Sequence, residues 1–283
     1  MEVEQRVQAR ATVLTPSERR IAETVLADPQ LVAFGTVADV ADAARVGTAT
    51  VVRFAAKLGF DGYTQLQASV QADLSGRLRP AVERIRDQPH VDDALADRHA
   101  EVESANVRST LAAVDRAAGR AVVHRLADDR HPVLVLSGVA SRGVALQFVG
   151  DLAQLRPDVT LLDGNQVDIV RTLATTPRDC TLVVLDLRRY ERWLLDALAL
   201  VTDSVDAFVV ALTDNVLSPL ATAADHRFVV SAASTGPFDS HVGTLALLDL
   251  FVVEIAATRR EAATDRLDAI EAAWSAADAL SDE

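Results

Sequence analysis

Residues 48–57 combine hydroxyls, small side chains and two cations in a short stretch. At helical spacing, the side chains suited to outward contact lie at the helix start or on one face: Thr48, Ala49, Thr50, Arg53 and Lys57. The side chains suited to packing inward share another face: Val51, Ala55 and Leu58. Hydroxyls, a methyl and cations on one helix face can contact the base edges and phosphates of DNA. The same spacing is also typical of an ordinary solvated helix face.

A second set of polar residues follows a short apolar run at Val133–Leu136. It includes Ser137, Gly138, Ser141 and Arg142, between an expected strand and an expected helix. Backbone N–H groups and hydroxyls at a helix N-terminus favour an anion. An ordinary strand-to-helix turn would have the same composition, so both interpretations stay open.

The stretch Asp186-Leu187-Arg188-Arg189-Tyr190-Glu191-Arg192 follows another apolar run. The neighbouring guanidiniums of Arg188 and Arg189 could bind a carboxylate or phosphate of a ligand. They could equally pair with Asp186 and Glu191 in a structural network.

Three further residues are candidates for ligand contact. Thr213 ends a fourth apolar run, and Ser218 precedes Pro219 in the loop that follows. His241 comes directly before a long apolar helix. For each residue the alternative is structural: a capped turn around Thr213 and Ser218, and a helix-start histidine.

The N-terminal segment has the capping and turn residues of a small helical domain. Thr15 and Glu18, and then Thr36 and Asp39, have the spacing of N-terminal helix caps. We expect Thr48 to cap a third helix, which ends at Gly59. Two short helices joined by a tight turn at 45–47 match the helix-turn-helix layout.

From residue 131 onward, short apolar runs alternate with helical patterns. The runs are Val133–Leu136, Val159–Leu162, Thr181–Leu187, Ala207–Leu212 and Phe228–Val230. This alternation predicts a five-stranded parallel sheet covered by helices on both faces. In such sheets ligands bind beside the carboxyl ends of the strands, where the polar loops described above would lie.

The expected organisation is therefore α plus α/β. We predict a helix-turn-helix domain over 1–76, a helical linker over 77–130, an α/β domain over 131–260 and a C-terminal helix over 261–283. The linker is expected to break at Gln88-Pro89-His90 and again near Asp115, which can cap its second helix.

Charge is distributed unevenly along the 283 residues. Residues 1–79 contain nine basic and nine acidic side chains, so the net charge of −13 lies in the rest of the chain. A neutral head leaves its local cations available to DNA, while an acidic partner domain weakens non-specific binding. The lone Cys180 favours a small core residue over a reactive thiol. No long apolar span or signal peptide is evident, so we expect a cytoplasmic protein without membrane contact.

Three segments of the head resemble RpiR/MurR-type bacterial regulators. They are Leu14–Glu18, Val37–Ala41 and Thr48–Tyr63, and the run Thr50–Tyr63 is the most specific part. The resemblance implies a sugar-isomerase-type (SIS) domain from about residue 132 to 255, and a homodimer or higher oligomer. It also implies binding to palindromic double-stranded operator DNA, controlled by a small anionic effector such as a sugar phosphate.

One loop departs from that family. SIS domains that bind sugar phosphates usually carry a Ser-x-Ser-Gly-x-Thr loop after the third strand, where this chain has Asp186-Leu187-Arg188-Arg189. A different organic anion, or a domain that only dimerises, is therefore an alternative. The other competing functions are a sugar-phosphate isomerase and a structural oligomerisation protein. We do not expect an isomerase, because no Glu–His pair is evident and an isomerase has no need of residues 1–74. We do not expect a purely structural protein, because it would leave the face of Thr50, Arg53 and Lys57 without a role. We expect no cofactor, because no metal-ligand cluster, phosphate-binding Gly-Lys loop or nucleophile turn is evident in the sequence.

Overall fold

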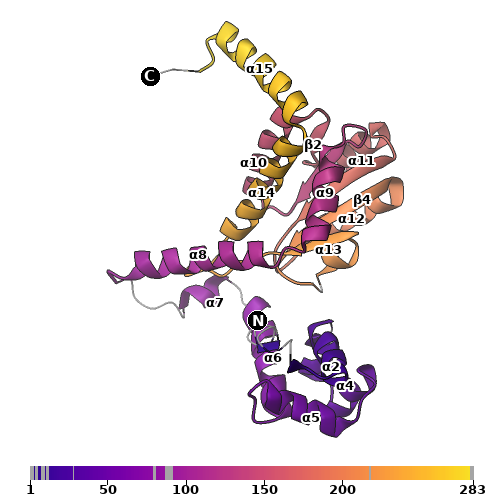
Figure 1. Cartoon of the computed structure of the whole chain (residues 1–283), viewed down its shortest axis with the longest axis vertical. Helices are drawn as coiled ribbons and strands as arrows, with labels where there is room; N and C mark the ends of the chain where they lie inside the picture. The colour runs from indigo at the N-terminus through magenta and orange to yellow at the C-terminus, as the bar shows by residue number, and fades with distance from the viewer. Residues whose placement is uncertain are drawn as a thin grey trace. The chain divides into compact units, whose positions relative to one another are not determined.

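The computed structural model describes residues 3, 6–7, 10, 13–27, 29–78, 81–86, 92–216 and 218–280. The chain folds as two compact units, residues 1–84 and 85–283 (Figure 1). The helix break expected at residues 88–90 lies outside the described residues. Across the described part, no helix is long and apolar enough to cross a membrane.

The first unit is built from short helices. They are α2 (Pro16–Ala27), α3 (Pro29–Phe34), α4 (Val37–Ala43), α5 (Thr48–Lys57) and α6 (Tyr63–Leu78). One apolar core joins them, because each helix turns aliphatic or aromatic side chains inward: Ile21, Val40, Val51, Phe54 and Leu66 are almost fully buried. The helical head predicted from the caps is confirmed.

Three helices lead from the head to the sheet: α7 (Ala81–Arg86), α8 (Leu95–Ala112) and α9 (Arg116–Ala127). Asp115 caps α9 as expected, by accepting hydrogen bonds from two backbone N–H groups. Both α8 and α9 pack against α14 (Val242–Thr258). The buried amide of Asn106 on α8 donates to the carbonyl of Ala233 and accepts from its N–H. These two helices are therefore part of the second unit.

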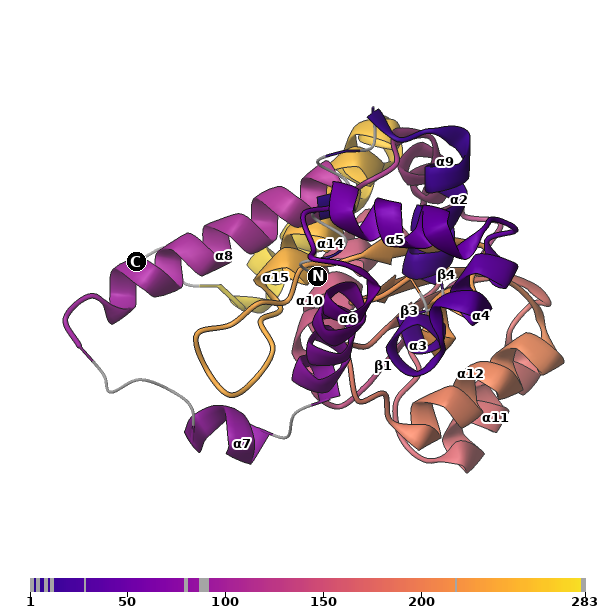
Figure 2. The same ribbon diagram turned by 90° about the horizontal axis from the view of Figure 1, so that it is seen from below.

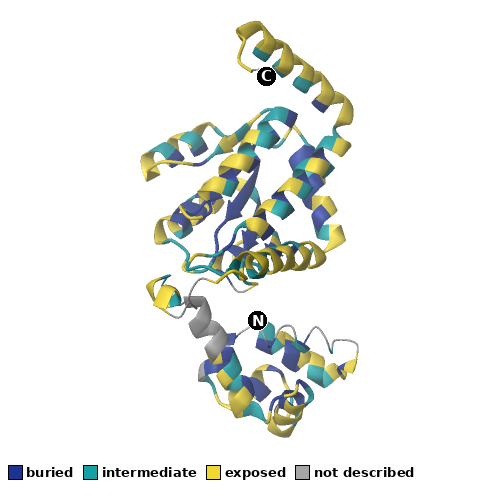
Figure 3. Ribbon diagram, turned by 90° about the vertical axis from the view of Figure 1, so that its left-hand side faces the viewer, coloured by how far each residue is buried: buried dark blue, intermediate teal, exposed yellow. Residues whose placement is uncertain are grey.

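The second unit contains a five-stranded parallel sheet in the order β2-β1-β3-β4-β5. The strands are β1 (Val133–Ser137), β2 (Val159–Leu161), β3 (Asp179–Leu185), β4 (Asp206–Thr213) and β5 (His226–Val229). Residues of β1 and β3 are buried on both faces, which explains their continuous apolar runs (Figure 3). Ser137 pairs in register with Leu185, so β1 and β3 end side by side.

Helices cover both faces of this sheet (Figure 2). On one face, α10 (Arg142–Leu155) and α14 share a core with α9. On the other face lie α11 (Gln166–Thr175), α12 (Arg192–Ser204) and the short α13 (Pro219–Thr222). The predicted three-layer α/β fold is confirmed. The chain continues into α15 (Arg260–Ala277).

Two arginines, the fully buried Arg156 and the partly buried Arg259, hold together the end of the sheet where the strands begin. Arg156 is fully buried and donates to the backbone carbonyls of Leu126, Asp128, His131 and Pro157. Arg259 donates to the carbonyls of Ala127 and Leu155. These guanidiniums tie the ends of α9, α10 and α14 together.

Candidate DNA-reading helix and effector site

Helix α5 follows α4 after a tight turn in which Arg45 has a positive φ of 53°. Thr36 and Asp39 form the predicted capping box at the start of α4. The prediction that Thr48 caps α5 is wrong: Gly47 is the N-cap residue, and Thr48 is the first residue inside the helix. Thr48 is exposed there, so its hydroxyl remains at the outer end of α5.

The two faces of α5 differ as the sequence indicates. Val51, Ala55 and Leu58 are fully buried in the head. Ala49 and Arg53 are exposed, and Thr50 is half-buried. The Arg53 guanidinium lies along the helix, with Nη2 donating to Thr50 Oγ1 at 3.4 Å. A rigid helix therefore presents a guanidinium and small polar groups outward.

Lys57 has an additional role within the head. Its Nζ donates to Glu18 Oε2 at 2.7 Å and to the Val13 carbonyl at 2.8 Å. The ammonium group of Lys57, more than any other neighbour, lowers the pKa of Glu18. This ion pair joins the end of α5 to the start of α2. Contact between Lys57 and DNA stays a prediction.

The second candidate site lies where β1, β3 and β4 end. Asp186 follows β3 directly and is only 4% exposed. Its Oδ1 accepts from the N–H of Leu187 at 3.0 Å and from Ser141 Oγ at 3.3 Å. A Cβ atom on Gly138 would lie 2.4 Å from the same oxygen. Glycine is therefore required at position 138, because the carboxylate packs directly on its backbone.

The second oxygen of Asp186, Oδ2, is buried and has no hydrogen-bond partner. Burial, together with the nearby negative charge of Glu191, raises the pKa of Asp186 to about 6. Glu191 itself accepts from the N–H of Val139 at 2.8 Å and from the indole of Trp193. Two carboxylates of the β3–α12 loop thus occupy the first loop, where the sequence suggested an anion.

The remaining residues of the β3–α12 loop contact the neighbouring loops. Arg188 Nε donates to both carboxylate oxygens of Asp239 at 2.9 Å. The Tyr190 hydroxyl donates to Asp214 Oδ1 at 2.6 Å and lies 3.1 Å from Thr213 Oγ1. Arg188 is therefore held in an internal ion pair, but not with the partners that the sequence suggested. Its acidic partner is Asp239, and neither Asp186 nor Glu191 pairs with Arg188 in the structure.

Other predicted ligand residues lie apart from this cluster or have internal partners. Arg142 forms an ion pair with Asp163 after β2. Ser218 caps α13 through a hydrogen bond from Ala221 N at 3.0 Å. Arg189 is exposed and has a φ of +68°, a left-handed conformation that arginine rarely adopts. Ser137 is buried at the end of β1.

His241 lies at the N-cap position of α14, close in sequence to Asp239. Its Nδ1 is buried without a hydrogen-bond partner, and burial lowers its pKa. Thr244, in the first turn of α14, likewise has a buried Oγ1 without a partner. Orphaned polar groups of this kind call for an occupant, such as water or a ligand.

Sequence reasoning missed Tyr190 and Asp239 as members of this site. Tyr190 stood in the quoted loop, but nothing local indicated its contact with Thr213. Asp239 is 51 residues from Arg188, and only the fold brings them together. Within the described residues there is no cluster of three or more side chains placed to hold a metal ion.

Two family models match the chain. Residues 1–77 match the helix-turn-helix domain of the rpiR family, and residues 145–254 match the SIS domain. An HTH-type transcriptional regulator of Haemophilus influenzae is 26% identical over 246 residues, covering 86% of this chain and 84% of that protein. A similar regulator of Caldanaerobacter subterraneus is 22% identical over 249 residues, covering 86% of each.

Two solved structures share the fold. The sugar isomerase domain of an RpiR transcription factor from Sphaerobacter thermophilus is 28% identical, with a TM-score of 0.58. The match covers 63% of this chain and 99% of that one. The NanR protein of Vibrio vulnificus, solved with ManNAc-6P, is 20% identical, with a TM-score of 0.55 and coverage of 96% and 97%. The chain thus joins a helix-turn-helix domain of the rpiR family to a SIS domain, the domain arrangement of a DNA-binding transcriptional regulator.

Proposed function

We propose that α5 reads double-stranded operator DNA and that a small organic anion, bound by the SIS domain, changes the affinity of this contact. The observation that carries the proposal is the exposed Arg53 on a helix whose opposite face is buried. Such a helix can enter the major groove without unfolding the head, and arginine is the commonest reader of guanine. A regulator of this kind acts in the cytoplasm, beside its DNA.

The proposal includes a homo-oligomer. Regulators with helix-turn-helix heads commonly bind as symmetric dimers to two half-sites, one helical turn of DNA apart or a multiple of it. Two heads also compensate for the small contact surface of one short helix.

The test is the affinity of the full chain for a duplex selected from a random DNA library. Fluorescence anisotropy would compare wild type with Arg53→Ala, which removes the guanidinium and leaves the buried face of α5 intact. We expect affinity to fall roughly 10- to 100-fold, because one good base contact is worth about 1–3 kcal/mol. The matched control is Arg19→Ala, which removes an exposed arginine from α2. Equal affinity of wild type and Arg53→Ala would reject α5 as the reading helix.

The effector part of the proposal rests on the polar loops where the strands end. Arg188 holds Asp239 in the way it would hold the carboxylate or phosphate of a ligand. His241 and Thr244 offer buried polar atoms that lack partners. The similar fold of NanR, which was solved with ManNAc-6P, supports a sugar phosphate or a related anion as the occupant.

We infer that this site senses its ligand and does not convert it. Isomerisation of a sugar phosphate needs an acid–base group that can reach the substrate. The best candidate, Asp186, packs on Gly138 and bonds within its own loops. SIS-fold relatives do include sugar-phosphate isomerases, so the expected lack of aldose–ketose turnover needs a direct assay.

A further inference from the structure

Helix α15 is only partly packed against the rest of its unit. Its first turns are held by buried Ala263 and by Arg266, which donates to the carbonyl of Ala153 on α10. Leu267 packs on the core, but Ile270 and Trp274 belong to none of the apolar clusters formed by the described residues. These three side chains are spaced along one face of α15. The outer half of the helix extends beyond the helices that cover the sheet (Figure 1), so its apolar face has no core partner among the described residues.

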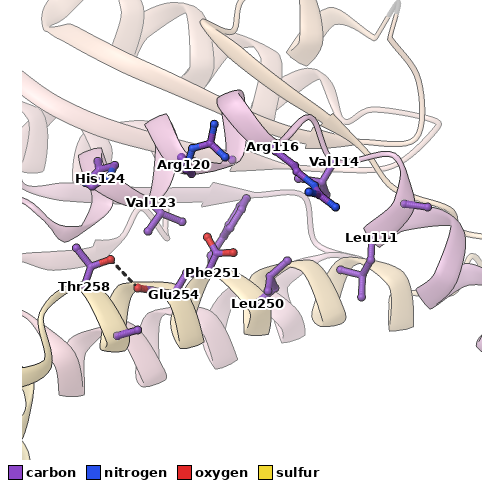
Figure 4. Close-up of a pocket in the computed structure, with 13 residues that line it drawn as sticks. Leu111, Val114, Arg116, Arg120, Val123, His124, Leu250, Phe251, Glu254 and Thr258 are labelled. Atoms are coloured by element: carbon purple, nitrogen blue, oxygen red, sulfur yellow. Dashed lines mark hydrogen bonds between the residues drawn. The ribbon is translucent and has the colours of Figure 1, made fainter.

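A groove of about 650 Å³ runs between α9 and α14 and ends at Leu111 of α8 (Figure 4). Its apolar surface comes from Val114, Val123, Leu250 and Phe251. We call it the α9–α14 groove. None of the residues predicted to bind the effector lines it.

The two surfaces carry opposite charge. Arg116, Arg120 and His124 lie one turn apart along α9, are exposed and line the groove, whereas Glu254 is the single acidic side chain among its lining residues. In the described part of the chain, Arg116 and Arg120 form no ion pair. In contrast, the sequence after Arg266 contains five acidic residues and no basic one. Two of these, Asp268 and Glu271, lie on the outer half of α15.

We propose that the α9–α14 groove holds α15 of a second copy of this chain, in a reciprocal exchange between two protomers. The inference deepens the proposed function, since it rests on the homo-oligomer and names its interface. The apolar face of α15 would cover Leu250 and Val114, while Asp268 and Glu271 approach the arginines of α9. The contact is isologous, because each copy supplies one groove and one helix.

The dimensions of the two surfaces agree. From Arg116 to His124 the basic row extends over about 12 Å of helix, and from Leu267 to Trp274 the apolar face extends over about 10 Å. A protomer's own α15 starts on the wrong side to fill its groove. Helix α14 contacts α10 on one side and α9 on the other, and α15 is anchored to α10.

The first experiment measures self-association of the full chain by sedimentation velocity. We expect wild type to dimerise and Trp274→Ala to raise the dissociation constant at least about tenfold, as for a buried aromatic anchor. The control is Trp193→Ala, which alters the only other tryptophan, on α12 in the opposite layer. Circular dichroism would check that each variant is folded. A monomeric wild type, or a dimer indifferent to Trp274→Ala, overturns the proposal.

A charge exchange provides an independent test. Arg116→Glu with Arg120→Glu should weaken the dimer, and Asp268→Arg with Glu271→Arg should weaken it too. Mixing these two variants restores attraction at both grooves of a heterodimer, one with the native charges and one with the charges exchanged. All four changes in one chain restore attraction at both grooves of a homodimer. Failure of the four-fold variant to dimerise more tightly than either double variant contradicts the docking geometry.

Cross-linking identifies the occupant. Ile270→Cys in one copy and Leu250→Cys in another should give a disulfide-linked heterodimer, and native Cys180 is buried. If the two cysteines placed in one chain link within a single monomer, α15 folds onto its own groove and the proposal is wrong. DNA binding is measured separately: a dimer that does not bind DNA rejects the proposed function alone, and a monomer that binds DNA rejects this interface alone.

Discussion

Asp186 places a carboxylate of the protein itself in the loop where the sequence suggested a bound anion. Its carboxylate lies against the backbone of Gly138 and accepts from Ser141, which together form the loop expected to hold an anion. Burial with one unpartnered oxygen makes the charged form costly, and this cost raises its pKa to about 6.

This cost predicts how stability depends on pH. Since the folded pKa of Asp186 lies above the ordinary value of 3.8, protonation favours folding. The favourable contribution is complete below pH 3.8 and is lost as the pH rises through about 6. Asp186→Asn mimics the neutral carboxyl. We therefore expect the difference in unfolding free energy between the variant and wild type to grow in favour of the variant as the pH rises from 4 to 8, by roughly 3 kcal/mol.

Urea unfolding at several pH values would measure this difference. Asp249→Asn, a change of an exposed carboxylate on α14, controls for the loss of one surface charge. A difference between wild type and Asp186→Asn that stays constant from pH 4 to pH 8 would contradict the argument.

For single residues, the sequence identified most members of the candidate effector site but few of the contacts between them. It marked Ser141 and Arg188 because a hydroxyl and a guanidinium suit an anion, and Asp186 as a possible partner of the arginines. It did not assign Asp186 to Gly138 or Arg188 to Asp239, since these contacts join loops that are 45 or more residues apart. Only the register of β1 against β3 brings the first pair together.

Among the elements, α5 depends on both local and distant contacts. Its existence is predictable, because the apolar spacing of Val51 and Ala55 and the following Gly59 are local signals. The cap was wrong because Gly47 adopts the extended conformation of an N-cap, which leaves Thr48 inside the helix. The ion pair of Lys57 with Glu18 joins residues 39 positions apart and has no local signal.

This ion pair leads us to expect that Lys57 positions α5 more than it binds phosphate. Lys57→Ala should lower the unfolding free energy of the protein by up to about 1 kcal/mol, the value of a partly exposed pair. It should leave the salt dependence of DNA binding unchanged, whereas loss of a phosphate contact lowers that slope by about 1. Thermal unfolding and anisotropy titrations from 50 to 200 mM salt would measure both quantities. A reduced slope would show direct contact with DNA.

In the whole molecule, the alternation of apolar runs with helices was sufficient to predict the parallel sheet, because strands buried on both faces are apolar throughout. The sequence did not indicate how the preceding helices attach. Asn106 contacts the backbone of Ala233, 127 residues away, and thereby joins α8 to the segment before α14. Such polar contacts have no periodic pattern.

The effector proposal makes a prediction at this scale, because a ligand that binds only the folded state stabilises it. A thermal-shift panel of glucose 6-phosphate, N-acetylmannosamine 6-phosphate, 6-phosphogluconate and inorganic phosphate should include a stabilising compound. Arg188→Ala combined with Arg189→Ala should abolish that shift, while Arg192→Ala, in the first turn of α12, should retain it. An unchanged shift in the double variant would exclude these arginines from the site. By linkage, the active compound and the operator must alter each other's affinity by the same factor.

The guanidiniums of Arg156 and Arg259 have a consequence for how a bound effector can act. Most of their contacts are with main-chain carbonyls, although Arg259 also pairs with Asp129, and such contacts can change only if the backbone moves. We therefore expect the end of the sheet where the strands begin to be stiff. The opposite end is joined by side-chain pairs such as Arg188 with Asp239, and an incoming anion can substitute for one member. We therefore expect displacement on binding to be concentrated in those loops and in the first turns of α14, while the strands stay in register. The start of α14 would therefore move relative to a sheet that keeps its position.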